Sequence, residues 1–411
     1  MHIIENGGVT AAKGYCAAGA CAGIKKKKEK PDMALVYSAF PCIMAGTFTT
    51  NVVKAAPVRR DMELLAKGGY VRAVVLNSGV ANACTGLPGE EDNKEMAEEC
   101  AKTLGSGVTA DEVLTASTGV IGARLPMDAV RRGTALLAGA LAGTLKAGHD
   151  AACAIMTTDT QPKECAVWIT IGGEKVTIGG MAKGSGMIHP NMATMLSVIT
   201  TDAAIDKELL QEAVSGCVKD SFNMISVDRD TSTNDSCIVL ANGQAGNEPI
   251  TKKDAGYEEF VKALGTVMTT LAKKMAADGE GASKLFEAVV KGARTKEEAV
   301  IAAKSVITSN LVKTAVYGND ANWGRILCAM GYSGVEFDPY RVDLTIQSAA
   351  GTVKLVENGM ATDYSEEFAT KVLSESEVTA IADMKQGDCE ATAWGCDLTY
   401  DYVKINADYR S

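Results

Sequence analysis

Apolar runs that end in polar, glycine-containing loops constrain the fold of this chain most. Residues 71–79 (VRAVVLNSG) predict a buried strand ending in such a loop, and residues 90–105 predict the helix that follows. Residues 112–122 (EVLTASTGVIG) predict a second strand that runs into a glycine loop, and residues 126–141 predict a second helix with Pro126 at its start. Repeated strands and helices of this kind indicate an α/β protein.

The remaining segments add a hairpin and further helices. Residues 165–180 alternate around Gly172-Gly173, which predicts a hairpin, and the apolar run 151–159 predicts a strand that ends in hydroxyl side chains. Helices are predicted for residues 206–223, 257–278, 295–309 and 324–331, strands for residues 235–243, 341–348 and 352–358, and a strand-rich end for residues 389–409. Because strands cluster and helices cluster, stacked α and β layers are favoured over a doubly wound parallel sheet.

Size and charge narrow the functional classes. The 411 residues are 46% hydrophobic, which is enough for two or more domains. The net charge is −10, and no basic stripe interleaved with aromatic residues is present, so nucleic-acid binding is not expected. The lysine run 25–28 is followed at once by Glu29 and is interpreted as a solvated loop.

Membrane insertion and metal binding are also not expected. The N-terminus lacks the pattern of a secretory signal, and the small apolar stretch 133–145 is shorter than the ~20 residues that span a bilayer, which favours a buried helix. Twelve cysteines are scattered without a C-x-x-C motif. They are interpreted as reduced thiols of a cytoplasmic protein, with no metal site.

The scarcity of histidine limits the catalytic chemistry. The chain holds only His2, His149 and His189, and it contains no G-x-S-x-G motif, so an enzyme of this sequence needs a nucleophile that works without imidazole. Residues 184–203 (GSGMIHPNMATMLSVITTDA) run from a polar loop into an apolar, strand-like segment, with Thr194 at the junction. Threonine is common at strand boundaries, so this position alone does not establish a nucleophile.

Cleavage of the peptide bond before Thr194 gives it a base of its own. The new α-amino group has a reference pKa of ~7.7–8.0, which suits a general base at neutral pH. The cut needs the same parts: the Thr194 hydroxyl attacks the Ala193 carbonyl, an ester forms, and water hydrolyses it. The segment therefore raises the hypothesis of a self-cleaving precursor.

Ordered sequence blocks then identify a family resemblance. Residues 183–196 (KGSGMIHPNMATML) resemble the signature of the ornithine acetyltransferases, also called glutamate N-acetyltransferases of arginine biosynthesis. Further blocks resemble the family in the expected order: AGTFTTN (45–51), NSGVANACTG (77–86), ASTGVIG (116–122), AIMTTDT (154–160), GEGASK (279–284), YGNDANWGRI (317–326) and CDLTYDYVKINADYRS (396–411). The resemblance covers essentially the whole chain.

The resemblance implies a fold, a processing event and an assembly. Residues 1–193 would form the α chain and residues 194–411 the β chain, with Thr194 as the new N-terminus and the acetyl-carrying nucleophile. The implied fold is the layered α/β ornithine acetyltransferase (ArgJ-like) fold, with β-sheets sandwiched between helical layers, analogous to but distinct from N-terminal-nucleophile hydrolases. The implied assembly is an α2β2 heterotetramer, and neither a metal nor an organic cofactor is implied.

The resemblance also assigns roles to individual residues. Thr118 and Gly119 match the oxyanion hole, where one donor lowers the barrier by about 2.7–4 kcal/mol. The positions that match substrate-binding residues, in addition to Thr194, are Thr157, Lys183, Glu280, Asn406 and Ser411. A lysine suits a carboxylate and a glutamate suits an ammonium group.

Three positions depart from the family pattern. Val80 stands where a polar Asn is expected, His189 stands where a small residue is common, and Ser411 stands where Thr is common. His189 is interpreted as a loop residue without a required role, with a proton carrier as the alternative. The hydroxyl of the last residue is kept by Ser411.

The implied activity is a ping-pong acetyl transfer from N2-acetyl-L-ornithine to L-glutamate through acetyl-Thr194, with acetyl-CoA as a possible second donor. A self-processing N-terminal-threonine hydrolase or aminopeptidase is the first alternative, since it shares the nucleophile but passes the acyl group to water. A phosphate-binding module using residues 179–186 is the second alternative, although G-x-x-x-x-G-K-[ST] is not matched.

Overall fold

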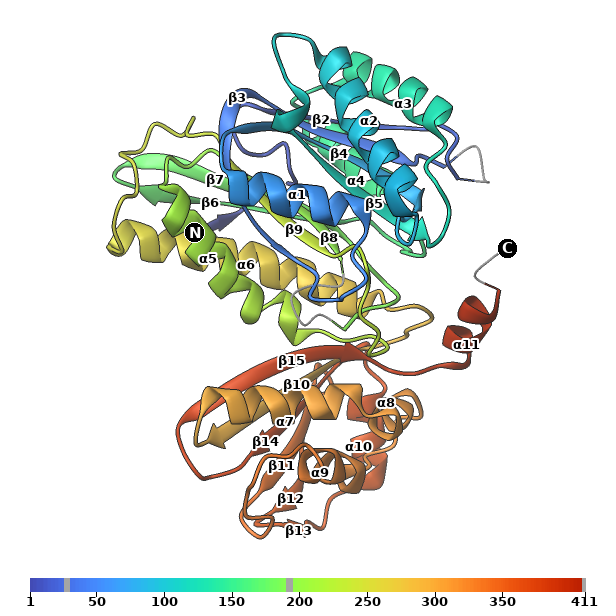
Figure 1. The fold of residues 1–411 in the computed structure, drawn as a ribbon. Helices are drawn as coiled ribbons and strands as arrows, with labels where there is room; N and C mark the ends of the chain where they lie inside the picture. Colours follow the sequence, from blue (N-terminus) through green and yellow to red (C-terminus); the bar gives the residue numbers. More distant parts are fainter. Residues whose placement is uncertain (26–29, 190–194, 409–411) are drawn as a thin grey trace. The chain divides into compact units, whose positions relative to one another are not determined.

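The computed structural model describes residues 1–25, 30–189 and 195–408, and Figure 1 shows the chain as a ribbon. Their contacts divide these residues into two compact units. Unit 1 holds the described residues of ranges 1–184, 195–223 and 231–272, and unit 2 holds residues 185–189, 224–230 and 273–408.

Unit 1 is built on one mixed sheet. Its strands are β1 (His2–Ile3), β2 (Tyr15–Ala20), β3 (Met33–Phe48), β4 (Val71–Val80), β5 (Val113–Val120), β6 (Lys163–Ile171), β7 (Glu174–Lys183), β8 (Leu196–Thr201) and β9 (Ser236–Ala241). Their order is β1-β6-β7-β8-β9-β3-β4-β5, and β2 pairs with β3. The pairs β4·β5 and β8·β9 are parallel, whereas the other pairs are antiparallel. Two strands therefore end together at each parallel pair.

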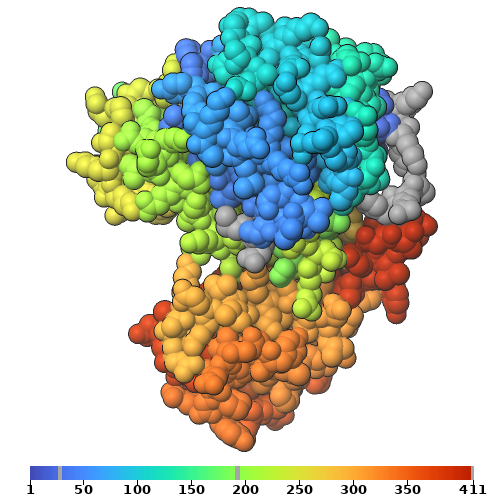
Figure 2. All heavy atoms as spheres, in the orientation of Figure 1, coloured from blue at the N-terminus to red at the C-terminus, as the bar shows by residue number. Residues whose placement is uncertain are grey.

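Helices flank this sheet. They are α1 (Ala56–Lys67), α2 (Gly86–Leu104), α3 (Met127–Ala140), α4 (Leu145–Ala154), α5 (Lys207–Lys219) and most of α6 (Ala255–Ala277). Helices α1 and α2 contact β5, α3 and α4 contact β2, and α5 contacts β3. In the space-filling view of Figure 2, the blue to cyan atoms of α1 and α2 form part of the surface of unit 1.

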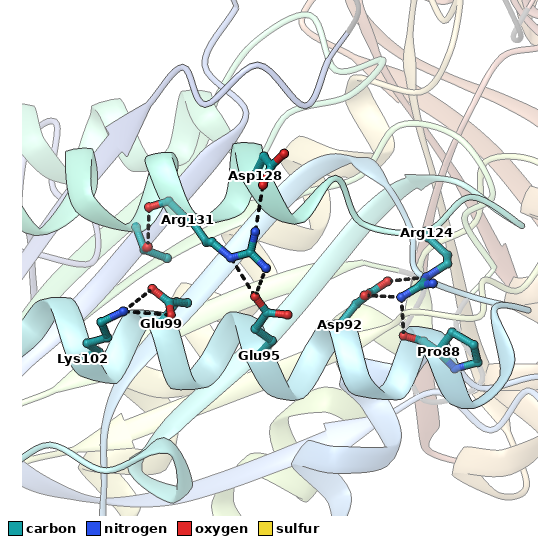
Figure 3. Close-up of polar contacts among 9 residues, drawn as sticks. Pro88, Asp92, Glu95, Glu99, Lys102, Arg124, Asp128 and Arg131 are labelled. Carbon is teal, nitrogen blue, oxygen red and sulfur yellow. Dashed lines mark hydrogen bonds and ion pairs between the residues drawn. The ribbon is translucent and has the colours of Figure 1, made fainter.

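Ion pairs join the outer surfaces of α2 and α3. Figure 3 shows the Arg131 guanidinium between Glu95 of α2 and Asp128 of its own helix. The Arg124 guanidinium binds Asp92 with an N–O distance of 2.6 Å. Solvent-exposed pairs such as that of Arg131 and Asp128 contribute ~0.2–1 kcal/mol each, so the buried apolar faces of the helices dominate the packing.

Unit 2 has a second sheet with strand order β13-β12-β11-β14-β10-β15. The strands are β10 (Leu285–Ala293), β11 (Asp343–Ser348), β12 (Gly351–Glu357), β13 (Met360–Ala361), β14 (Glu377–Asp383) and β15 (Cys389–Cys396), and the helices are α7 (Lys296–Thr308), α8 (Asn310–Tyr317), α9 (Trp323–Gly331), α10 (Glu366–Leu373) and α11 (Tyr400–Ala407). Helix α7 packs on β10 and β15, and α10 packs on β11 and β12. The prediction of stacked α and β layers is confirmed in both units.

Most predicted elements are present. The hairpin turns at Gly172 and Gly173, whose φ angles of 60° and 91° suit a two-residue turn between right-twisted strands. Within the described residues, no single helix is long and apolar enough to cross a membrane. Helices α7 and α8 taken together have the length and composition of a membrane span, but they are bent by 57° at the break between them.

Three predictions are wrong in part. Residues 151–159 do not form a strand, because the alanine-rich segment lies in α4, whose N-cap Thr144 accepts a hydrogen bond from the Ala147 amide. The stretch 133–145 is not one buried helix, because α3 ends at Ala140 and leaves Leu136 exposed. Residues 389–409 hold strand β15 and then helix α11, which begins after the side-chain cap of Thr399.

Candidate active site

The predicted oxyanion-hole residues lie at the carboxyl end of β5. Thr118 pairs with Ser78 and Gly119 pairs with Gly79 of the parallel strand β4. The φ angle of Gly119 is 132°, and a Cβ atom added there would lie 2.2 Å from the Gly79 carbonyl carbon. Only glycine fits this close approach of two backbones without displacing a strand.

Lys183 lies at the end of β7 and contacts Thr118. Its side chain is buried, and its Nζ donates a hydrogen bond to Thr118 Oγ1 over 3.2 Å. Because the Thr118 oxygen accepts from Lys183, its own hydroxyl hydrogen is available to another acceptor. Two residues that the sequence placed 65 positions apart thus share one hydrogen bond.

The buried acid Asp159 connects Thr157, another predicted substrate-binding residue, to the backbone beside Lys183. Its carboxylate accepts hydrogen bonds from the Thr157 amide at 3.0 Å and from the Gly184 amide at 2.8 Å. It also forms an ion pair with Lys163 at 2.6 Å, in which both side chains are fully buried. Burial favours a raised pKa, but Lys183, Lys163 and these hydrogen bonds hold the pKa of Asp159 well below its usual range.

The prediction that the lysine run 25–28 is a solvated loop is wrong at Lys25. Lys25 is half-buried, and its Nζ donates to the carbonyl oxygens of Pro31 and Met156, each over 2.8 Å. Burial lowers the pKa of Lys25 to about 8, with Asp32 and Asp159 opposing that shift. This residue holds the segment directly before Thr157, and residues 26–28 lie outside the described residues.

The predicted nucleophile Thr194 and its neighbour Ala193 lie outside the described residues, as does Ser411. The described chain resumes at Met195, whose carbonyl oxygen accepts from the Ser236 amide over 2.8 Å. Strand β8 then pairs with β7 through Lys183 and Leu196. In the sequence, Thr194 is two positions before Leu196, the residue of β8 that pairs with Lys183.

Two predicted substrate-binding residues contact each other in unit 2. Asn406 Nδ2 donates to Glu280 Oε2 over 2.8 Å, and the Glu280 amide donates to the Ser185 carbonyl, also over 2.8 Å. A Cβ atom added at Gly186 would lie 2.3 Å from the Glu280 carboxyl carbon. Gly186 therefore leaves the space that the Glu280 carboxylate fills.

The two internal departures from the family pattern have local explanations. Val80 keeps the loop bonded through its backbone, because its carbonyl accepts from Asn77 Nδ2 at 2.8 Å while Ser117 Oγ donates to Asn77 Oδ1 at 2.6 Å. His189 Nδ1 lies 3.0 Å from Ser226 Oγ. Burial, with smaller contributions from Lys304 and Arg229, lowers the pKa of His189 to about 4, so its ring is neutral at pH 7.

Comparison with known proteins identifies the family. The sequence model of the ArgJ family matches residues 16–411. This chain belongs to the ArgJ family. An arginine biosynthesis bifunctional protein ArgJ from Symbiobacterium thermophilum is 55% identical over 98% of this chain and 99% of its own length. The protein of the same name from Caldanaerobacter subterraneus is 51% identical over all of both chains.

Solved ArgJ-family structures are also similar. The arginine biosynthesis bifunctional protein of Bacillus halodurans is 46% identical, covering 51% of this chain and 96% of that chain with a TM-score of 0.48. The ornithine acetyltransferase of Mycobacterium tuberculosis, solved with ornithine, is 44% identical, covering 46% of this chain and 98% of that chain with a TM-score of 0.42.

Sequence reasoning missed three buried groups of this ArgJ-family chain: Asp159, Lys163 and Asp235. Asp235 directly precedes β9, and burial raises its pKa well above the usual range. Its Oδ2 has no hydrogen-bond partner within the described ranges. Within those ranges no group of three or more His, Cys, Asp or Glu side chains could hold a metal ion. The sequence feature that could have indicated Asp159 and Asp235 is the hydroxyl-rich block in which each lies, AIMTTDT (154–160) and TSTND (231–235).

Proposed function

We propose that this chain is a glutamate N-acetyltransferase that passes the acetyl group of N2-acetyl-L-ornithine to L-glutamate by way of Thr194. Its membership of the ArgJ family over nearly the whole chain carries this proposal. The contact between Lys183 and Thr118 supports it, since the family's substrate-binding and oxyanion-hole positions meet at the end of β5. Arginine biosynthesis is the pathway named for the relatives.

The proposed reaction begins with self-cleavage between Ala193 and Thr194. The freed amine takes the proton from the Thr194 hydroxyl, whose oxygen then attacks the N-acetyl carbon. Ornithine leaves with a proton, and the glutamate amine attacks the acetyl ester to give N-acetylglutamate and the original hydroxyl. The Thr118 hydroxyl and the Gly119 amide serve as donors to the oxyanion in both steps, each lowering the barrier by about 2.7–4 kcal/mol.

Substrate recognition in this proposal uses opposite charges. Lys183 meets the substrate carboxylate and Glu280 meets the ammonium group of ornithine, while Thr157, Asn406 and Ser411 supply neutral hydrogen bonds. No metal or organic cofactor takes part. Acetyl-CoA is a possible second donor, consistent with the word bifunctional in the relatives' name. The proposal includes a cytoplasmic location and an α2β2 assembly, and twelve scattered cysteines without a C-x-x-C motif suit a reducing compartment.

Intact-mass spectrometry tests the processing step. The wild-type protein is expected as two fragments, the second beginning Thr-Met-Leu-Ser, whereas Thr194→Ala is expected to stay at 42.9 kDa. An uncut wild-type protein with full activity contradicts the scheme. Incubation with N2-acetyl-L-ornithine, with and without L-glutamate, tests the transfer: N-acetylglutamate is expected, and free acetate formed regardless of glutamate indicates a hydrolase instead.

A further inference from the structure

Helix α4 and strand β6 bring a thiol, an imidazole and a carboxylate into one hydrogen-bonded chain. His149 and Cys153 are four residues apart on α4, so their side chains lie on the same face of the helix. The Cys153 sulfur lies 3.6 Å from His149 Nε2, and His149 Nδ1 lies 2.7 Å from Glu164 Oε2 of β6. The order of the groups is that of a nucleophile, a base and a residue that orients the base.

Packing within unit 1 sets the position of the Glu164 carboxylate. Glu164 lies opposite Met181 in the pairing of β6 with β7, and its side chain is only 12% exposed. A Cβ atom added at Gly8 would lie 2.4 Å from Glu164 Oε1, so the glycine leaves the space that this carboxylate fills. A carboxylate at this place accepts from Nδ1 of His149, which leaves Nε2 of the neutral ring as the acceptor for the Cys153 thiol.

Two effects on the reactivity of Cys153 oppose each other. Burial, with smaller contributions from Glu164 and Asp150, raises the pKa of the Cys153 thiol. Lys146, which pairs with Asp150 at 2.6 Å, opposes this shift. The sulfur is therefore protonated at pH 7, and a thiol becomes a nucleophile only when it gives up its proton. His149 provides an acceptor for that proton, and the Glu164 carboxylate stabilises the imidazolium that results.

Both members of the pair on α4 are accessible from solvent. The His149 side chain is 51% exposed, and Cys153 is half-buried. A small molecule can therefore approach the sulfur from the side of the imidazole. Acetyl transfer through Thr194 uses neither residue, so the pair needs another explanation.

We propose that Cys153 is a modification site for small disulfides, at which His149 takes the proton of the thiol and Glu164 orients His149. The Cys153 sulfur attacks one sulfur of a disulfide R–S–S–R as its proton passes to His149 Nε2. A new S–S bond forms and the old one breaks, and the leaving thiolate takes the proton from the imidazolium and departs as R–SH. Cys153 is oxidised and the disulfide is reduced. This inference does not rest on the proposed function.

The test follows the full-length protein in hydroxyethyl disulfide, a small and uncharged disulfide, and measures the modified fraction of each cysteine by peptide mass spectrometry. Cys84 is the internal reference, because it is exposed and no hydrogen bond joins it to a histidine within the described part of the chain. Cys153 is expected to react about tenfold faster than Cys84 at pH 7, although Cys153 is the more buried of the two.

Three variants assign the effect to the proton acceptor. His149→Gln is expected to slow Cys153 at least about tenfold and to leave Cys84 unchanged, and Glu164→Gln is expected to slow Cys153 less. The wild-type rate is expected to level off at a pH where the His149→Gln rate still rises with ionisation of the thiol. His2→Gln is the matched control, because His2 lies in the same unit and stacks on Trp168, and it is expected to change neither rate.

The unchanged rate at Cys84 shows in each variant that the fold is intact. A wild-type Cys153 that reacts no faster than Cys84 overturns the inference, because burial then outweighs proton transfer. Equal Cys153 rates in the wild type and His149→Gln overturn it as well. The acetyl-transfer assay is independent of both results, so a failure here leaves the proposed function as it stands.

Discussion

Replacement of Gly119 by alanine tests the geometry at the end of β5 most directly. Alanine at a φ of 132° is strained by about 1–3 kcal/mol. The new Cβ atom would also lie 2.2 Å from the Gly79 carbonyl carbon and 2.5 Å from its oxygen. Ordinary contact needs more than 3 Å, so the ends of β4 and β5 have to separate by roughly 1 Å.

That separation moves the donors of the proposed oxyanion hole. Loss of one such donor costs about 2.7–4 kcal/mol, so the kcat of Gly119→Ala is expected to fall about 10²–10³-fold. Self-cleavage is expected to slow as well, because it forms an oxyanion of the same kind. Steady-state transfer kinetics, intact-mass spectrometry of freshly made protein and thermal unfolding measure the three effects.

Gly122→Ala is the matched control for this variant. Its φ of 84° is also unfavourable for alanine, but no atom lies within 4 Å of the added Cβ. It is expected to lose about 1 kcal/mol of stability with little change in kcat. Equal stability and equal turnover in the two variants would refute the argument that the β4–β5 contact positions the donors.

Three further predictions concern single side chains. Glu280→Gln is expected to raise the KM for N2-acetyl-L-ornithine about tenfold, and that for L-glutamate less, because it removes the anion proposed to meet ornithine's ammonium; steady-state kinetics with each substrate measures this. The lowered pKa of His189, about 4 against 6.5, predicts stability that is lost as pH falls from 6.5 towards 4, and urea unfolding of His189→Gln should lack that loss. Burial raises the pKa of Asp61 to about 8, so stability falls as pH rises from about 4 to 8, and Asp61→Asn should be more stable by about 1–3 kcal/mol at pH 8 in the same assay.

The sequence predicted those elements whose pattern is local. Residues 71–79 and 112–122 form strands because their apolar runs are buried in the sheet, and Gly172-Gly173 defines its hairpin by turn geometry alone. Residues 151–159 were mistaken because alanine suits both a buried strand and a closely packed helix. The packing decides between them: a Cβ added at Gly19 would lie 2.2 Å from the Asp150 carbonyl oxygen of α4.

The site was predictable only where the resemblance supplied positions. Thr118, Gly119, Thr157 and Lys183 lie in one unit with the expected chemistry, and their roles stay predictions. The Asp159–Lys163 pair could not be found from spacing, because nothing in the sequence distinguishes a buried ion pair from two solvated charges. The predicted α chain (residues 1–193) and β chain (residues 194–411) are the products of a cut in the backbone. The two compact units are defined by contacts between residues instead, so they do not test that prediction.

The strand order of unit 1 has a consequence for a nicked molecule. Strands β8 and β9 come after the proposed cut, yet they lie between β7 and β3, which come before it. The pairs β7·β8 and β9·β3 are both backbone hydrogen-bond ladders buried in the core. Cleavage would therefore leave the two pieces joined in one sheet. Separation should require denaturant, and a gel run under native conditions should report one species even after complete processing.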